Sequence, residues 1–136
     1  METEYRRTWD DTAPDARREW VRRAYRCAAE LLLQNGVSPH TKGFVLLQYG
    51  IMLMERQSPM RRVVLRDTIY PALERLTERD GSAEHAIRDA IRLRAQSKTP
   101  KDGSLFPAER IPTNAEFLFA LSAQMRRQLQ ETKEKE

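Results

Sequence analysis

The sequence predicts an all-α protein, a compact helical bundle that contains a helix-turn-helix. Apolar residues recur every three or four positions in several stretches, which is the period of a helix with one buried face. Proline and glycine residues stand between these stretches. The segment 61–69 is compatible with a strand or a helix by itself, but it has predicted helices on both sides and is expected to be helical.

Length and composition favour one globular domain. A chain of 136 residues can bury one real core but is short for two. Hydrophobic residues make up 40% and charged residues 32%, a balance typical of folded proteins. We expect a flexible segment at 1–14, a single domain at 15–130 and a charged tail at 131–136. The net charge of +4 suits a polyanionic partner without requiring one.

The first predicted helix spans 15–34 and ends at Asn35-Gly36, a pair typical of a left-handed C-cap. Its inner face carries residues at helical spacing: Trp20, Ala24, Cys27 and Leu31. Cys27 is the only cysteine, so an internal disulfide is excluded, and its place in the apolar pattern predicts a buried thiol rather than a nucleophile. A strongly apolar stretch at 44–55 predicts the central buried helix.

Two further helices form the predicted helix-turn-helix, at about 71–96. The first is short and begins at Pro71, because proline is tolerated in the first turn of a helix. The turn is Asp80-Gly81-Ser82, and the second helix follows at 83–96 with a narrow apolar face and a polar face that carries cations.

The last helix has the clearest start signal in the chain. After a loop at 97–113, in which Leu105 and Phe106 are expected to anchor onto the core, Thr113 and Glu116 stand at capping-box spacing. The inner face of this helix is predicted to contain Phe117, Leu118, Leu121, Met125 and Leu129.

Four ordered blocks resemble the C-terminal effector domain of the stage 0 sporulation protein A family of response regulators. The blocks are NGVSPHTKGF, IYPAL, EHAIRDAIR and IPTNAEF, and the similarity covers about residues 31–129. The resemblance implies a helical bundle whose helix-turn-helix enters the major groove of operator DNA. It also implies that the helix starting near Ser82 is the recognition helix, with Arg88 at the position of a family arginine.

The chain departs from the family pattern in and before this helix. Ser82 and His85 stand where the family carries arginines, Asp89 replaces a histidine, and one residue is missing from the turn. No receiver module is recognisable before the domain, so control by aspartyl phosphorylation is not expected.

Binding is favoured over catalysis. The sequence has no phosphate-binding glycine loop, zinc-protease motif or nucleophile elbow, and its two histidines form no catalytic constellation. We therefore expect a cytoplasmic DNA-binding transcriptional regulator, not an enzyme, with no cofactor, metal, membrane span or small-molecule substrate. The residues expected to contact duplex DNA are Ser82, His85, Arg88, Arg92, Arg94, Arg61 and Arg62, with Arg66 beside them. The alternative is a protein-interaction module, a homodimer or a modulator of another regulator, that keeps the fold without operator recognition.

Overall fold

A computed structural model describes residues 14–56, 64–77, 83–94, 105–107 and 110–135. In these ranges the chain is all-α and has no strand, as the sequence predicts. The elements are α2 (Pro14–Gln34), α3 (Gly43–Arg56), the π-helical turn η1 (Leu65–Ile69), α4 (Tyr70–Thr77), α5 (Ala83–Leu93) and α6 (Asn114–Lys135). None of the described helices is long and apolar enough to span a bilayer.

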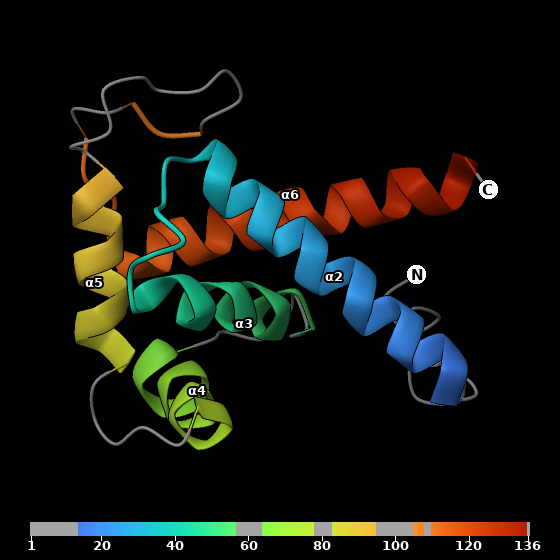
Figure 1. Cartoon of the computed structure of the whole chain (residues 1–136), viewed down its shortest axis with the longest axis horizontal. Helices are drawn as coiled ribbons and strands as arrows, with labels where there is room; N and C mark the ends of the chain where they lie inside the picture. The colour runs from blue at the N-terminus through green and yellow to red at the C-terminus, as the bar shows by residue number, and fades with distance from the viewer. Residues whose placement is uncertain (1–13, 57–63, 78–82, 95–104, 108–109, 136) are drawn as a thin grey trace.

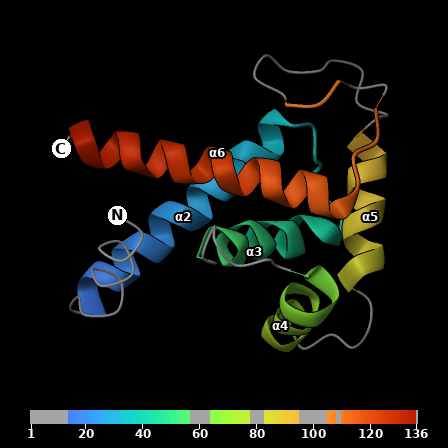
Figure 2. The same ribbon diagram turned by 180° about the vertical axis from the view of Figure 1, so that it is seen from behind.

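The long helices α2 and α6 cross each other, and α3 packs against both (Figures 1 and 2). The helix α5 lies at one end of the molecule and runs across the ends of α3 and α6, with α4 beside it. The core lies between these helices, and its fully buried members include Leu31, Leu47, Ile51, Phe117 and Leu121. α5 is therefore an edge helix, and among the described residues His85, Asp89 and Arg92 on its outer side are exposed.

The predicted end of the first helix is confirmed. Gly36 has a φ of 83°, the Gly36 amide donates to the Leu33 carbonyl (3.1 Å), and the Val37 amide donates to the Leu32 carbonyl (2.9 Å). These are the paired hydrogen bonds of a Schellman cap, which needs a left-handed residue that glycine supplies without steric cost.

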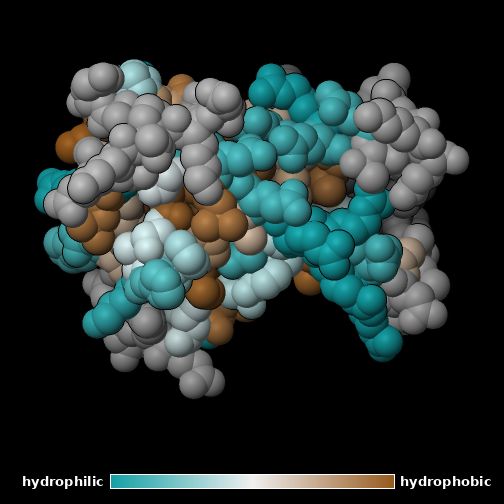
Figure 3. All heavy atoms as spheres, turned by 45° about the horizontal axis from the view of Figure 1, so that its top comes forward, coloured by the Kyte–Doolittle hydropathy of each residue, from teal (hydrophilic) through white to brown (hydrophobic). Residues whose placement is uncertain are grey.

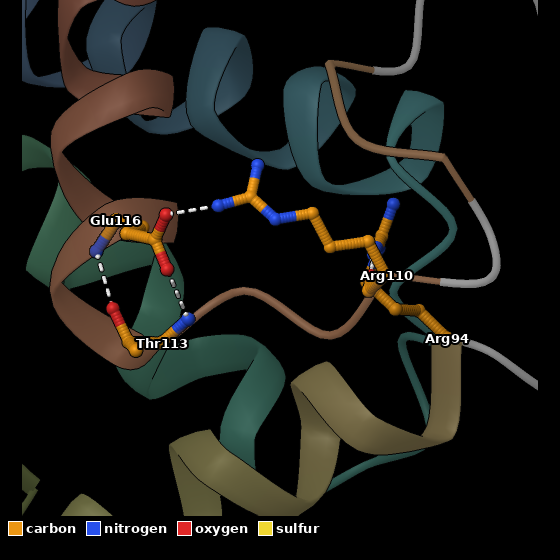
Figure 4. Close-up of polar contacts among 4 residues, drawn as sticks. All are labelled: Arg94, Arg110, Thr113 and Glu116. Atoms are coloured by element: carbon orange, nitrogen blue, oxygen red, sulfur yellow. Dashed lines mark hydrogen bonds and ion pairs between the residues drawn. The ribbon is translucent and has the colours of Figure 1, made fainter.

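The predicted start of the last helix is confirmed as well. The Thr113 amide donates to Glu116 Oε1 (3.0 Å), and the Glu116 amide donates to Thr113 Oγ1 (3.1 Å), as Figure 4 shows. This reciprocal pair is a capping box. The Glu116 carboxylate also forms an ion pair with Arg110.

Three features differ from the sequence expectations. The last helix continues to Lys135 because residues 131–135 contain neither proline nor glycine. Residues 65–69 are helical as expected, but they form a π-turn that continues directly into α4 at Tyr70, so no separate helix begins at Pro71; a proline near this junction is tolerated although it cannot donate a backbone hydrogen bond. Of the two expected loop anchors, Phe106 is buried, whereas Leu105 is exposed.

Candidate nucleic-acid interface

The inner face of α5 is fixed by small and branched residues. Ala83, Ile87, Ala90 and Ile91 are buried against the rest of the bundle. The N-terminus of α3 approaches this face so closely that a Cβ at Gly43 would lie 2.3 Å from the Ala86 carbonyl oxygen. Only glycine fits at this crossing, and it holds α5 directly against α3.

Polar contacts tie α4 and α6 to the beginning of α5. A carboxylate oxygen of Glu74, on α4, accepts a long hydrogen bond from the Ala83 amide (3.5 Å) at the start of α5. The Asn114 side-chain amide donates to Tyr70 Oη (2.9 Å) and to the Glu84 carbonyl (3.2 Å). Burial raises the pKa of the Tyr70 hydroxyl above its ordinary value. These contacts fix the first turn of α5 relative to the helix that precedes it.

The outer face of α5 is polar and open to solvent. His85, Asp89 and Arg92 are exposed, and Arg88 is half-buried. Arg88 Nη2 lies 2.7 Å from Glu84 Oε1, one helical turn away, so this arginine is held along the helix by an ion pair. Three of the predicted DNA contacts, His85, Arg88 and Arg92, therefore share one face.

This face has little net charge, because two carboxylates lie beside its two arginines. Glu84 neutralises Arg88, and Asp89 lies between Arg88 and Arg92 along the helix. Carboxylates near a docking face repel phosphates, whereas arginines attract them. The near balance of charges gives this face little long-range attraction for a polyanion.

The expectation that Arg94 contacts DNA is corrected by its position. The Arg94 side chain is only 6% exposed. Its guanidinium donates to the backbone carbonyl oxygens of Asn35 (2.7 Å) and Phe106 (2.9 Å), with a longer contact to that of Arg110 (3.4 Å). The same group lies 5.6 Å from the ring centroid of Phe117, and burial lowers its pKa from the ordinary value. Arg94 is therefore an internal structural residue, and Figure 4 shows it at the end of α5 next to Arg110.

The position of Arg94 in the sequence already indicates a buried, structural role. Arg94 continues the inner-face series of Ala83, Ile87 and Ala90 at intervals of three and four residues. Its partner, Asn35, could not be recognised from spacing because the two residues are 59 positions apart in the chain. The Asn35 side chain also accepts a hydrogen bond from the Leu105 amide (2.8 Å), so the loop, α2 and α5 meet at this point.

The remaining predicted contacts, Arg61, Arg62 and Ser82, lie outside the described residues. Arg66 lies on η1 and is exposed. Cys27 is buried, and its thiol donates to Gln128 Oε1 (3.2 Å). Burial, with the nearby carboxylates of Glu30 and Glu55, raises the pKa of this thiol to about 11, so it is a poor nucleophile at neutral pH. Within the described ranges, no three histidine, cysteine or acidic side chains gather as metal ligands.

No family model, no curated protein and no solved structure matches the chain.

Proposed function

We propose that this chain is a cytoplasmic DNA-binding transcriptional regulator in which α5 enters the major groove of duplex DNA. The observation that carries the proposal is the division of α5 into two faces. Its inner face is locked onto α3, and its outer face presents His85, Arg88 and Arg92 at the edge of the bundle. The similarity to the effector domain of sporulation response regulators supports the same role for this helix. A rigid edge helix with a polar outer face has the geometry required of a recognition helix.

In this proposal Arg92 contacts a phosphate or guanine directly, and Arg88 does so after exchanging Glu84 for DNA. Arginine forms paired hydrogen bonds with guanine or phosphate, which makes it the best cation for either contact. The ion pair between Glu84 and Arg88 then lowers the affinity for the duplex, because it must be broken before Arg88 can reach the DNA.

The alternative is a protein-interaction module. It is favoured by the two carboxylates on α5, which leave the outer face nearly neutral, as many protein interfaces are. It predicts that substitutions on this face leave DNA binding unchanged.

Fluorescence anisotropy with a labelled duplex tests the two candidates. The duplex carries the operator of the sporulation family, a scrambled duplex serves as the comparison, and both are titrated across a salt series. Arg92→Ala should weaken binding and lower the slope of log K against log salt by about 0.9 if it contacts a phosphate. Glu84→Gln should strengthen binding, because it removes a negative charge and releases Arg88.

Arg127→Ala is the matched control, since Arg127 is exposed in the C-terminal half of α6, and it is the start of α6 that lies near α5 (Figure 1). Equal affinity of the wild type, Arg92→Ala and Glu84→Gln for the operator would refute groove binding by α5. Equal affinity for the operator and the scrambled duplex would reduce the proposal to nonspecific binding.

A further inference from the structure

Two parallel rows of side chains run along the outer surface of α2. One row is apolar and contains Val21, Tyr25, Ala29 and Leu33. The neighbouring row begins with three arginines and contains Arg18, Arg22, Arg26 and Glu30. Within each row the residues are four apart, so they lie on one face of the helix with a rise of about 6 Å between neighbours.

Three residues of the apolar row are exposed although they are the kind that a core usually buries, whereas Ala29 is half-buried against the core. Val21 is 42% exposed, Tyr25 is 37% exposed and Leu33 is 39% exposed. The Tyr25 ring lies 5.5 Å from the ring of Tyr49 on α3, which extends the apolar surface away from the arginine row. The surface is thus a strip with α3 on one side and cations on the other.

Positive charge is concentrated in the middle of this helix, which over its whole length carries five arginines and three acidic residues. Residues 16–28 contain five arginines and one glutamate, a net charge of +4 that equals the net charge of the whole chain. The ion pair between Arg22 and Glu19 is loose, because Arg22 Nη1 and Glu19 Oε2 are 4.0 Å apart and both side chains are solvated. Figure 3 shows hydrophilic side chains gathered along α2. The N-terminal half of α2 lies at the opposite end of the molecule from α5 (Figure 1).

We infer that the strip on α2, with Tyr49 of α3 at its edge, is a docking surface for an acidic amphipathic helix of a partner protein. A helix with apolar residues in one row and carboxylates in the next has the same repeat as the strip. Such a helix would cover Val21 and Tyr25 and pair its carboxylates with Arg22 and Arg26. This is the arrangement of a helical interface whose apolar seam is flanked by complementary charges.

The chemistry of the strip selects this occupant over two others. A second copy of α2 packed face to face would bring arginines against arginines, and like charges oppose association. Duplex DNA would satisfy the arginines but would leave the apolar row without a partner. Tyrosine and arginine together are enriched at the energetic centres of protein interfaces. The inference does not depend on DNA binding by α5.

A labelled synthetic helix tests the inference directly. The peptide, of about 20 residues to match α2, carries leucines in one i, i+4 row and glutamates in the adjacent row. A scrambled peptide of the same composition is the comparison. In anisotropy titrations with the full chain, we expect the patterned peptide to bind at least about 10-fold more tightly than the scrambled one, a difference of about 1.4 kcal/mol.

Charge reversal provides the decisive variant. The double substitution Arg22→Glu with Arg26→Glu should weaken binding of the glutamate peptide at least about 10-fold and create binding of a peptide with lysines in place of the glutamates. Arg75→Glu with Arg127→Glu is the matched control, because both residues are exposed on other helices. Circular dichroism confirms that each variant is folded.

Three outcomes would overturn the inference. The first is equal affinity for the patterned and scrambled peptides, which would mean that charge alone drives binding. The second is no effect of the double reversal on the glutamate peptide. The third is loss of duplex DNA binding in the double reversal with unchanged peptide binding, which would assign the arginines to nucleic acid. Failure of the α5 proposal would be seen separately, in Arg92→Ala.

Discussion

The same substitution at Arg94 and at Arg92 distinguishes a structural role from a DNA-contacting role for the two arginines at the end of α5. Arg94→Met keeps the apolar stem of the side chain but removes the guanidinium that donates to the carbonyl oxygens of Asn35 and Phe106. Arg92→Met makes the same chemical change two positions earlier, where the side chain is exposed. The two variants therefore differ in burial and contacts rather than in chemistry.

The expected cost of Arg94→Met follows from these contacts. A hydrogen bond to a charged donor contributes about 1.5 to 3 kcal/mol, and a buried acceptor left without its donor costs a similar amount. The two shorter bonds, at 2.7 Å and 2.9 Å, give a destabilisation of about 3 kcal/mol when each is assigned the lower value. Arg92→Met should stay within about 0.5 kcal/mol of the wild type, as exposed substitutions usually do.

Urea unfolding followed by circular dichroism measures both effects. With a slope of about 1.5 kcal/mol per molar urea, Arg94→Met should lower the midpoint by about 2 M, and Arg92→Met should leave it nearly unchanged. DNA binding should show the reverse pattern, because folded Arg94→Met keeps the outer face of α5. A loss of less than about 0.5 kcal/mol in Arg94→Met would refute the structural role of its hydrogen bonds.

Three other substitutions or treatments test separate parts of the structure. Gly43→Ala should destabilise the fold by about 1 to 3 kcal/mol, since the added Cβ meets the Ala86 carbonyl oxygen, which belongs to the backbone of α5. Gly50→Ala should change the stability by less than about 1 kcal/mol, because its Cβ meets only the end of the Leu118 side chain, at 3.0 Å, which can shift. The Glu116 carboxylate accepts a hydrogen bond from the Thr113 amide, which lowers the pKa of this carboxyl from its ordinary value. The carboxylate therefore stabilises the fold above the unfolded pKa, and this contribution is lost as the pH falls through the lower folded pKa. Glu116→Gln should remove this part of the pH dependence when the melting temperature is measured between about pH 7 and pH 3. The Cys27 thiol, with a pKa of about 11, should react with iodoacetamide far more slowly in the folded chain than in urea at neutral pH.

Each of these expectations has a clear contrary result. Equal melting temperatures for Gly43→Ala and Gly50→Ala would mean that α3 and α5 separate easily. If the melting temperatures of the wild type and Glu116→Gln changed with pH in parallel, the charge of the Glu116 carboxylate would contribute nothing to stability. Equal alkylation rates of Cys27 in folded and unfolded chain would contradict its burial.

Local signals allowed much of the fold to be predicted. The end of α2 at Asn35-Gly36 and the start of α6 at Thr113 depend on residues within one helical turn, and both predictions are confirmed. The apolar face of α5 was predicted from periodicity alone and is buried as expected. These features depend on backbone chemistry that neighbouring residues determine.

Features that depend on long-range contacts were not predictable. The sequence shows the charge of Arg94 and so predicts a DNA contact. It does not show the acceptors of Arg94, because these are backbone carbonyl oxygens of Asn35 and Phe106, residues outside α5. The pairing of Glu84 with Arg88 has ordinary i, i+4 spacing, yet only the structure shows which of several charged neighbours the arginine selects. Charge composition alone therefore overestimated the number of cations available to a duplex.

The junction of Asn35, Arg94 and Leu105 also has a consequence for how the chain reaches its native state. Its hydrogen bonds join residues 59 and 70 positions apart, so they cannot form until the intervening chain has closed two large loops. Contacts of this separation are slow to form, whereas the helices themselves form locally. A nascent chain that ends before Leu105 lacks one side of this junction, and we expect the Arg94 end of α5 to acquire its fixed position only after that residue has emerged from the ribosome.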